Sequence, residues 1–167
     1  MAIKSLVQKQ NKAGRRAQAM VEFAIALPVL LLLLFGIMEV GRLMLMYTLV
    51  SNASRDAVRF ASAVGLDDSG TLKYLNCAGI ETSAQNSAYF VTLLPFGASN
   101  ITYDSGPGTT SLGTCQGNGW QNVVSGSRVT VTAQATYTPM VSLIPVSPRT
   151  ISATSSRTIL GIFKLDN

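Results

Sequence analysis

The hydrophobic pattern divides the chain into a long apolar run near the N-terminus and shorter patterned stretches after it. From Phe23 to Met38 the sequence contains no charged residue, and a second apolar stretch ends at Val50. A helix from Val21 to Val50 would be roughly 45 Å long at about 1.5 Å per residue. The hydrocarbon core of a bilayer is about 30 Å thick. The pattern therefore predicts one membrane-spanning helix, over residues 21–47.

Helical periodicity continues beyond this span, and Gly65 is a suitable stop signal. We therefore expect one long helix with a transmembrane half and an amphipathic half. The apolar face of the second half comprises Val50, Ala53, Ala57, Phe60, Ala61 and Val64, and the polar face comprises Asn52, Ser54, Arg55, Asp56 and Arg59.

The remaining sequence predicts a small mixed domain. Thr71 to Tyr89 favours a second helix, and the Gly-, Ser- and Thr-rich stretch from Ser105 to Asn122 favours a long loop. Alternation is weak over residues 100–103 but clear over residues 129–137 and 151–159, which indicates strands. We therefore predict an α+β fold, with a small antiparallel sheet packed on the long helix. The expected apolar stripe of the second helix is Leu72, Leu75, Ala78, Gly79 and Thr82.

The charge distribution predicts how the chain is oriented in a membrane. Five Lys and Arg residues precede Val21, whereas from Val21 onward eight Lys and Arg balance eight Asp and Glu. A basic tail beside an apolar helix is retained on the cytoplasmic side and contacts anionic lipid headgroups. We expect residues 1–20 to be cytoplasmic and residues 48–167 to be extracytoplasmic. The neutral balance after the tail argues against nucleic-acid binding.

Three residues inside the apolar segment need an explanation. Pro28 removes a helix hydrogen bond, so a bend or a loosened turn is expected there. Glu39 and Arg42 are three residues apart and can pair on one helix face at the membrane boundary. Their charges also argue against a cleaved signal peptide, because small neutral residues should occupy that position.

Glu22 lies at the inner edge of the apolar run, where an ionisable side chain is costly. Such a residue is a candidate functional site. The equally good alternative is a boundary glutamate that reaches back to Arg15 or Arg16. The residues alone do not separate these interpretations.

Cysteine and histidine content limits the possible chemistry. Cys77 and Cys115 are the two cysteines, and histidine is absent, which leaves no plausible zinc site. Outside the cytoplasm the two thiols are expected to form a disulfide, and the alternative is a pair of buried free thiols. Without histidine there is no His-based general base, and the sequence has no phosphate-binding or dinucleotide motif. We expect neither catalysis nor a cofactor.

One further motif has the spacing of a metal-dependent adhesion site, Asp67-x-Ser69-x-Thr71. That motif should follow a buried strand, whereas here it follows the end of a helix. Asp and Ser are also common helix caps. We therefore favour capping of the next helix over metal binding.

The stretch from Arg15 to Pro28, RRAQAMVEFAIALP, resembles the start of the TadE-like family. These proteins are the minor pilins or pseudopilins of the tight-adherence (Flp) pilus system. The resemblance continues through Gly36, Glu39, Gly41 and Arg42, and more weakly into the two clear predicted strands. It implies a pilin-like subunit in the bacterial cytoplasmic membrane, with a single span and no catalytic role.

The resemblance also implies processing by a prepilin peptidase. Counting back from Glu22 as the fifth mature residue places the cut between Ala17 and Gln18, although Ala17 stands where glycine is usual. Glu22, Phe23 and Pro28 would then be assembly residues, with Glu22 pairing with the terminal ammonium of a neighbouring subunit. The implied partners are the lipid bilayer, other pilin or pseudopilin subunits, the assembly platform and the peptidase. The alternative is a membrane-anchored envelope binding module that never enters a filament.

Overall fold

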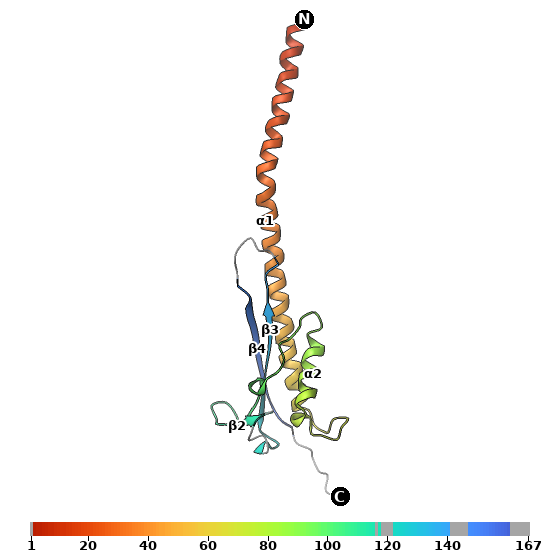
Figure 1. Cartoon of the computed structure of the whole chain (residues 1–167), viewed down its shortest axis with the longest axis vertical. Coiled ribbons are helices and arrows are strands. Elements are labelled where there is room, and N and C mark those ends of the chain that lie inside the picture. Colours follow the sequence, from red (N-terminus) through yellow and green to blue (C-terminus); the bar gives the residue numbers. More distant parts are fainter. Residues whose placement is uncertain (1, 116, 118–121, 141–146, 161–167) are drawn as a thin grey trace. The chain divides into compact units, whose positions relative to one another are not determined.

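The computed structural model describes residues 2–115, 117, 122–140 and 147–160 (Figure 1), with side chains from residue 17 onward except at residue 98. The elements fall into two compact units, Met1–Arg42 and Leu43–Asn167. Helix α1, Ala2–Ser62, makes up the first unit and contributes residues 43–62 to the second. The predicted long N-terminal helix is confirmed.

The described strands of the second unit form one antiparallel sheet in the order β2-β1-β3-β4. Strands β3 and β4 pair continuously over ten residues each, which confirms the two clear strand predictions. The α+β prediction is confirmed as well. The strands are β1 (Ile101–Asp104), β2 (Ser111–Thr114), β3 (Arg128–Tyr137) and β4 (Arg149–Thr158).

Strand β2 corrects the prediction of one long loop after Ser105. Gly113 and its polar neighbours suggest a loop by composition, but Thr102 and Tyr103 of β1 pair with Thr114 and Gly113. The side chains of β2 are exposed or only half-buried, so their burial does not account for the strand. Its extended conformation comes from backbone hydrogen bonding to β1. Residues 116 and 118–121 of the predicted loop lie outside the described residues.

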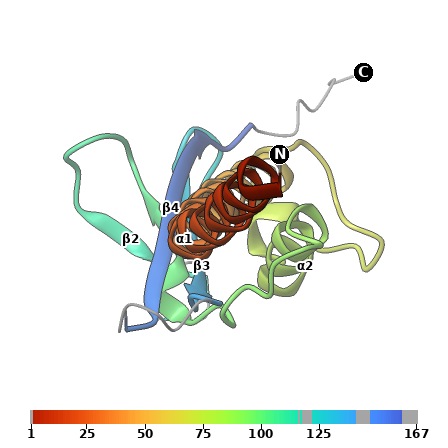
Figure 2. The same ribbon diagram turned by 90° about the horizontal axis from the view of Figure 1, so that it is seen from above.

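Within the second unit, residues 43–62 of α1 lie between the sheet and helix α2, Cys77–Ser87 (Figure 2). On the sheet side, the hydroxyls of Ser54 and Ser155 are 2.9 Å apart. On the other side, the Ser87 hydroxyl donates to the Asp56 carboxylate at 2.6 Å. The small size of the intervening alanines allows both layers to approach α1 closely.

The buried residues largely follow the predicted apolar face of α1. Val50, Ala53, Ala57 and Ala61 are fully buried, together with the inward-facing residues of β3. Ser54, which was assigned to the polar face, is also fully buried; its hydroxyl bonds to the Ser51 carbonyl and to Ser155. These partners offset the cost of removing the hydroxyl from water. The prediction for Val64 is wrong too, because α1 ends at Ser62 and Val64 is exposed.

Helix α2 is shorter than predicted and presents a different face. Asn76 is its N-cap and accepts a hydrogen bond from the Gly79 amide at 2.7 Å. The buried stripe is Ile80, Ala84 and Ala88, whereas Thr82 on the predicted stripe is exposed. The predicted apolar face included residues 72 and 75, which precede the helix, so the wrong face was predicted to be buried. A 3-10 turn, Lys73–Leu75, occupies that position.

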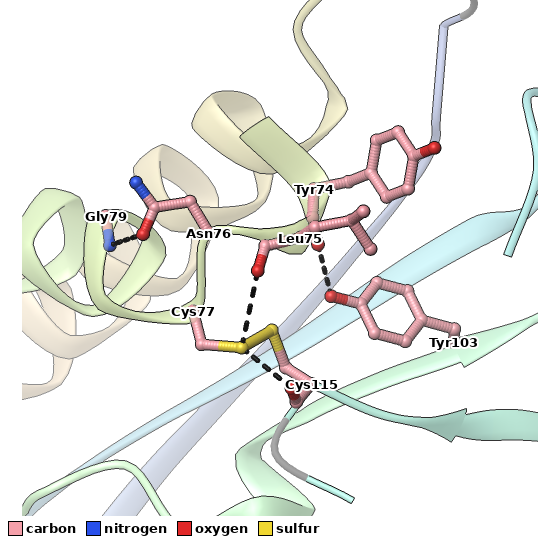
Figure 3. Close-up of a disulfide and its surroundings, with 7 residues drawn as sticks. All are labelled: Tyr74, Leu75, Asn76, Cys77, Gly79, Tyr103 and Cys115. Carbon is pink, nitrogen blue, oxygen red and sulfur yellow. Dashed lines mark hydrogen bonds between the residues drawn. A yellow bond between two sulfur atoms is a disulfide. The ribbon is translucent and has the colours of Figure 1, made fainter. Parts of the chain in front are cut away.

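A disulfide joins Cys77, the first residue of α2, to Cys115, the residue after β2 (Figure 3). The predicted pairing is therefore present in the structure. Close by, the hydroxyl of the fully buried Tyr103 donates to the Tyr74 carbonyl, and burial raises the pKa of Tyr103. These contacts attach the start of α2 to the β1–β2 side of the sheet.

Candidate membrane-anchor and assembly segment

The apolar residues of α1 in the first unit are exposed to the surroundings of the chain. Ile25 is 68% exposed, Leu33 64% and Ile37 71%. Within the described residues, α1 is the helix whose length and composition suffice to cross a membrane. A soluble monomer rarely exposes a continuous apolar surface of this size. Lipid or a neighbouring chain is the environment that suits such a surface.

Glu22 lies on one face of this segment together with apolar residues one, two and three turns further on. Glu22 borders a shallow surface groove of about 520 Å³, which Ile25, Ala26, Val29, Leu30 and Leu33 also line. The Gln18 side-chain amide donates to Glu22 Oε1 at 3.1 Å. Gln18 is therefore the described partner of Glu22. The predicted alternative partners, Arg15 and Arg16, have side chains outside the described part.

The predicted processing and assembly positions are all accessible on α1. Ala17 and Gln18 are exposed, and so is Phe23, at 63%. Pro28 lies within α1, which is continuous through it. Because proline has no amide hydrogen, the carbonyl of Ala24 loses its usual helix partner. The helix therefore lacks one of its backbone hydrogen bonds at this carbonyl.

Glu39 and Arg42 form the predicted pair. Arg42 Nη1 and Glu39 Oε1 are 3.5 Å apart, and both side chains are partly exposed. An exposed pair at this distance contributes little to stability. Within an apolar segment, each charge of the pair offsets the other.

Asp67 closes its own loop and does not cap the following helix. Its Oδ1 accepts from the Ser69 amide at 2.9 Å, the Ser69 hydroxyl at 2.7 Å and the Thr71 amide at 2.8 Å. These bonds, with the Ser69 hydroxyl as the largest cause, lower the pKa of Asp67. The prediction that this motif caps the next helix is therefore wrong, because the N-cap of α2 is Asn76. Among the residues the structure describes, no group of three or more His, Cys, Asp or Glu could hold a metal ion.

Comparison with known proteins identifies the segment that carries the family pattern. The family model described as "TadE-like protein" matches residues 17–59. No curated protein and no solved structure matches the chain. The matched stretch contains the candidate processing position, Glu22, Pro28 and the Glu39–Arg42 pair. The TadE-like resemblance is therefore confirmed over residues 17–59.

Proposed function

We propose that this protein is a non-catalytic minor pilin or pseudopilin that takes part in assembly of a tight-adherence pilus or a related secretion apparatus. The observation that carries the proposal is the coincidence of the TadE-like segment with an exposed apolar helix that bears Glu22 on an apolar face. An ordinary membrane anchor has no use for a carboxylate at this position, where it is costly.

In this proposal the chain spans the bacterial cytoplasmic membrane once, with its N-terminus in the cytoplasm and residues 48–167 outside. The excess of five basic residues before Val21 supports this orientation. The Cys77–Cys115 disulfide supports it independently, because disulfides persist in oxidising compartments.

Cleavage between Ala17 and Gln18 by a prepilin peptidase would create an ammonium group four residues before Glu22. A carboxylate in an apolar environment needs a paired cation. Glu22 of one subunit would pair with the new terminus of its neighbour, and the pair would fix the axial register between helices. In the uncleaved chain the Gln18 amide already bonds to Glu22, so assembly requires this local contact to be exchanged.

The partners in this proposal are the lipid bilayer, other pilin or pseudopilin subunits, the assembly platform and the peptidase. A second candidate is a membrane-anchored envelope binding module that is never processed. Ala17 favours this alternative, because glycine is usual before the cut in the resembled family.

The first experiment measures the mature N-terminus. The full chain would be expressed with and without an active prepilin peptidase, extracted from membranes and analysed by intact mass. We expect a chain that begins at Gln18 when the peptidase is active, and more complete cleavage for Ala17→Gly. Retention of residues 1–17 by both proteins, beside a processed pilin from the same cells, would favour the anchored module.

The second experiment tests Glu22 with Glu39→Gln as the matched control in the same helix. Removing one partner of a buried charge pair costs about 3–5 kcal/mol, which corresponds to about a hundredfold or more in an equilibrium. We therefore expect Glu22→Gln to insert into membranes normally but to be strongly depleted from sheared pili. Equal incorporation of Glu22→Gln, Glu39→Gln and wild type would contradict the assembly role.

A further inference from the structure

Strand β4 lies at the edge of the sheet, and among the described residues one side of its backbone is unpaired. In an antiparallel pair, successive residues point their amide and carbonyl groups alternately toward and away from the partner strand. The Ile159 amide donates to the Ser127 carbonyl at 2.8 Å, so the odd-numbered residues of β4 face β3. The even-numbered residues, including Ser152, Thr154 and Ser156, therefore direct their backbone groups outward. Within the described ranges these groups have no backbone partner.

This edge lacks most of the features that normally prevent another strand from adding to it. Proteins protect edges with short strands, bulges, proline and charged side chains, especially lysine. Strand β4 is ten residues long, contains no proline or lysine, and pairs with β3 without a shift in register. Its two charged residues, Arg149 and Arg157, lie near its ends. The edge therefore offers a regular template for an additional strand.

A basic groove lies beside the same edge. It has a volume of about 680 Å³ between α1 and β4, and is lined by Arg55, Asp56, Val58, Arg59, Ser155, Ser156 and Arg157. Arg55 and Arg59 are one turn apart on α1. Arg157 is on the helix-facing side of β4 because it has the same parity as Ser155, which contacts Ser54 of α1.

The three guanidinium groups of this groove have no carboxylate partner among the residues that the structure describes. The Asp56 carboxylate accepts a hydrogen bond from Ser87 of α2. Arg128 of the neighbouring strand is different, because it forms two hydrogen bonds with Asp104, at 2.8 and 2.9 Å. The groove thus combines an excess of positive charge, three guanidinium groups against one carboxylate, with an open strand edge.

We propose that this edge and groove bind an extended, acidic segment of another polypeptide, which adds to the sheet beside β4. The backbone of such a segment would pair with the even-numbered residues of β4. Alternate side chains of the added strand would face the groove, so carboxylates at every second position would reach Arg157, Arg55 and Arg59. This mode of recognition takes affinity from backbone hydrogen bonds and specificity from the alternate side chains.

Two independent observations favour a polypeptide over other anions. Phosphate or an anionic lipid headgroup would use the arginines but would leave the strand edge unpaired. A neutral strand would use the edge but not the arginines. The inference holds for a filament subunit and for an anchored module alike, so it does not depend on processing at Ala17 or on Glu22.

The test uses the full chain in nonionic detergent and a fluorescein-labelled ten-residue peptide that alternates threonine with glutamate. The control peptide has lysine in place of glutamate. We expect saturable binding of the acidic peptide, measured by fluorescence anisotropy, and none of the basic peptide. Arg157→Gln should weaken binding by about tenfold, as expected for loss of a charge-assisted hydrogen bond.

Backbone pairing is tested separately at Ser152, whose side chain has no hydrogen bond in the described structure and whose amide faces the open edge. Ser152→Pro removes that donor without removing a bond to β3, and should abolish binding, whereas Ser152→Ala should bind like wild type. Hydrogen exchange of the wild-type chain supplies a measurement that does not need the proline variant. The peptide should slow exchange at the outward amides of Ser152, Thr154 and Ser156.

Three results would overturn the proposal. One is acidic-peptide binding without slower exchange at those amides. Another is equal competition by inorganic phosphate or by phosphatidylglycerol vesicles at matched charge, which would indicate an anion site. The third is unchanged affinity of the Arg157→Gln and Ser152→Pro variants.

Discussion

Replacing both Cys77 and Cys115 with serine tests how strongly the disulfide stabilises the second unit. The two residues are 38 positions apart, and the loop that they close contains α2, β1 and β2. In the chain-entropy model, opening a loop of this length lowers the free energy of unfolding by about 4 kcal/mol. That is a large part of the total stability of a domain, which is about 5–15 kcal/mol.

The location of the bond explains why the folded state depends on it. Strand β2 has four residues and pairs with β1 at the edge of the sheet, so few contacts hold it. For a unit of this size, about 4 kcal/mol corresponds to a decrease in melting temperature of about 12–20 °C. We expect the variant to fold but to melt at a clearly lower temperature.

The assay follows the near-ultraviolet circular dichroism of the full chain in nonionic detergent. The fully buried Tyr103 contributes to this signal, whereas helical signal from the anchor would obscure unfolding at shorter wavelengths. Reduced wild type should melt like the double variant, and the variant should be insensitive to reductant. A loss of less than about 1 kcal/mol in both samples would refute the reasoning, because the unfolded chain would then be constrained without the bond.

Two further substitutions test local features of the second unit by thermal unfolding. Gly79→Ala would ordinarily stabilise a helix by about 1 kcal/mol. Here an added Cβ would lie 2.7 Å from the Asn76 side chain that caps α2 and 3.0 Å from the Phe60 ring, so we expect the variant to be less stable than wild type. A higher melting temperature of the variant would show that the cap can move. The Arg128 hydrogen bonds hold the pKa of Asp104 below its usual value, so the stabilisation that they give is present above about pH 4 and is lost as the pH falls through the folded-state pKa. Asp104→Asn should therefore lower the free energy of unfolding more at about pH 7 than at about pH 2.5. An equal effect at both pH values would contradict this linkage.

The long helix and the two long strands could be predicted because their signals are local. Alternation from Val129 to Tyr137 places every second side chain on one face, and no competing pattern exists within that stretch. Strand β2 could not be predicted in this way, since its pairing with β1 rather than its own side chains gives it strand conformation. The buried face of α2 was predicted wrongly because the helix begins after its cap at Asn76, later than the sequence pattern indicated.

The candidate sites differ in the same respect. Glu22 and the Glu39–Arg42 pair lie within one helix, where sequence spacing defines relative position. The basic groove joins Arg55 and Arg59 to Arg157, about a hundred positions later, through packing that the sequence does not reveal. Ser54 illustrates the same limit, because its burial becomes understandable only once Ser155 is known to supply a partner.

The enclosure of α1 residues 43–62 between the sheet and α2 has a mechanical consequence. Ala53, Ala57 and Ala61 are fully buried and have small side chains, and the sheet and α2 cover this part of the helix on two sides. A pulling force applied to the sheet would therefore load this part of α1 in shear, distributed over many small contacts at once. Shear across such an interface has no single contact that fails first, so this unit is expected to resist tension until it unfolds as a whole.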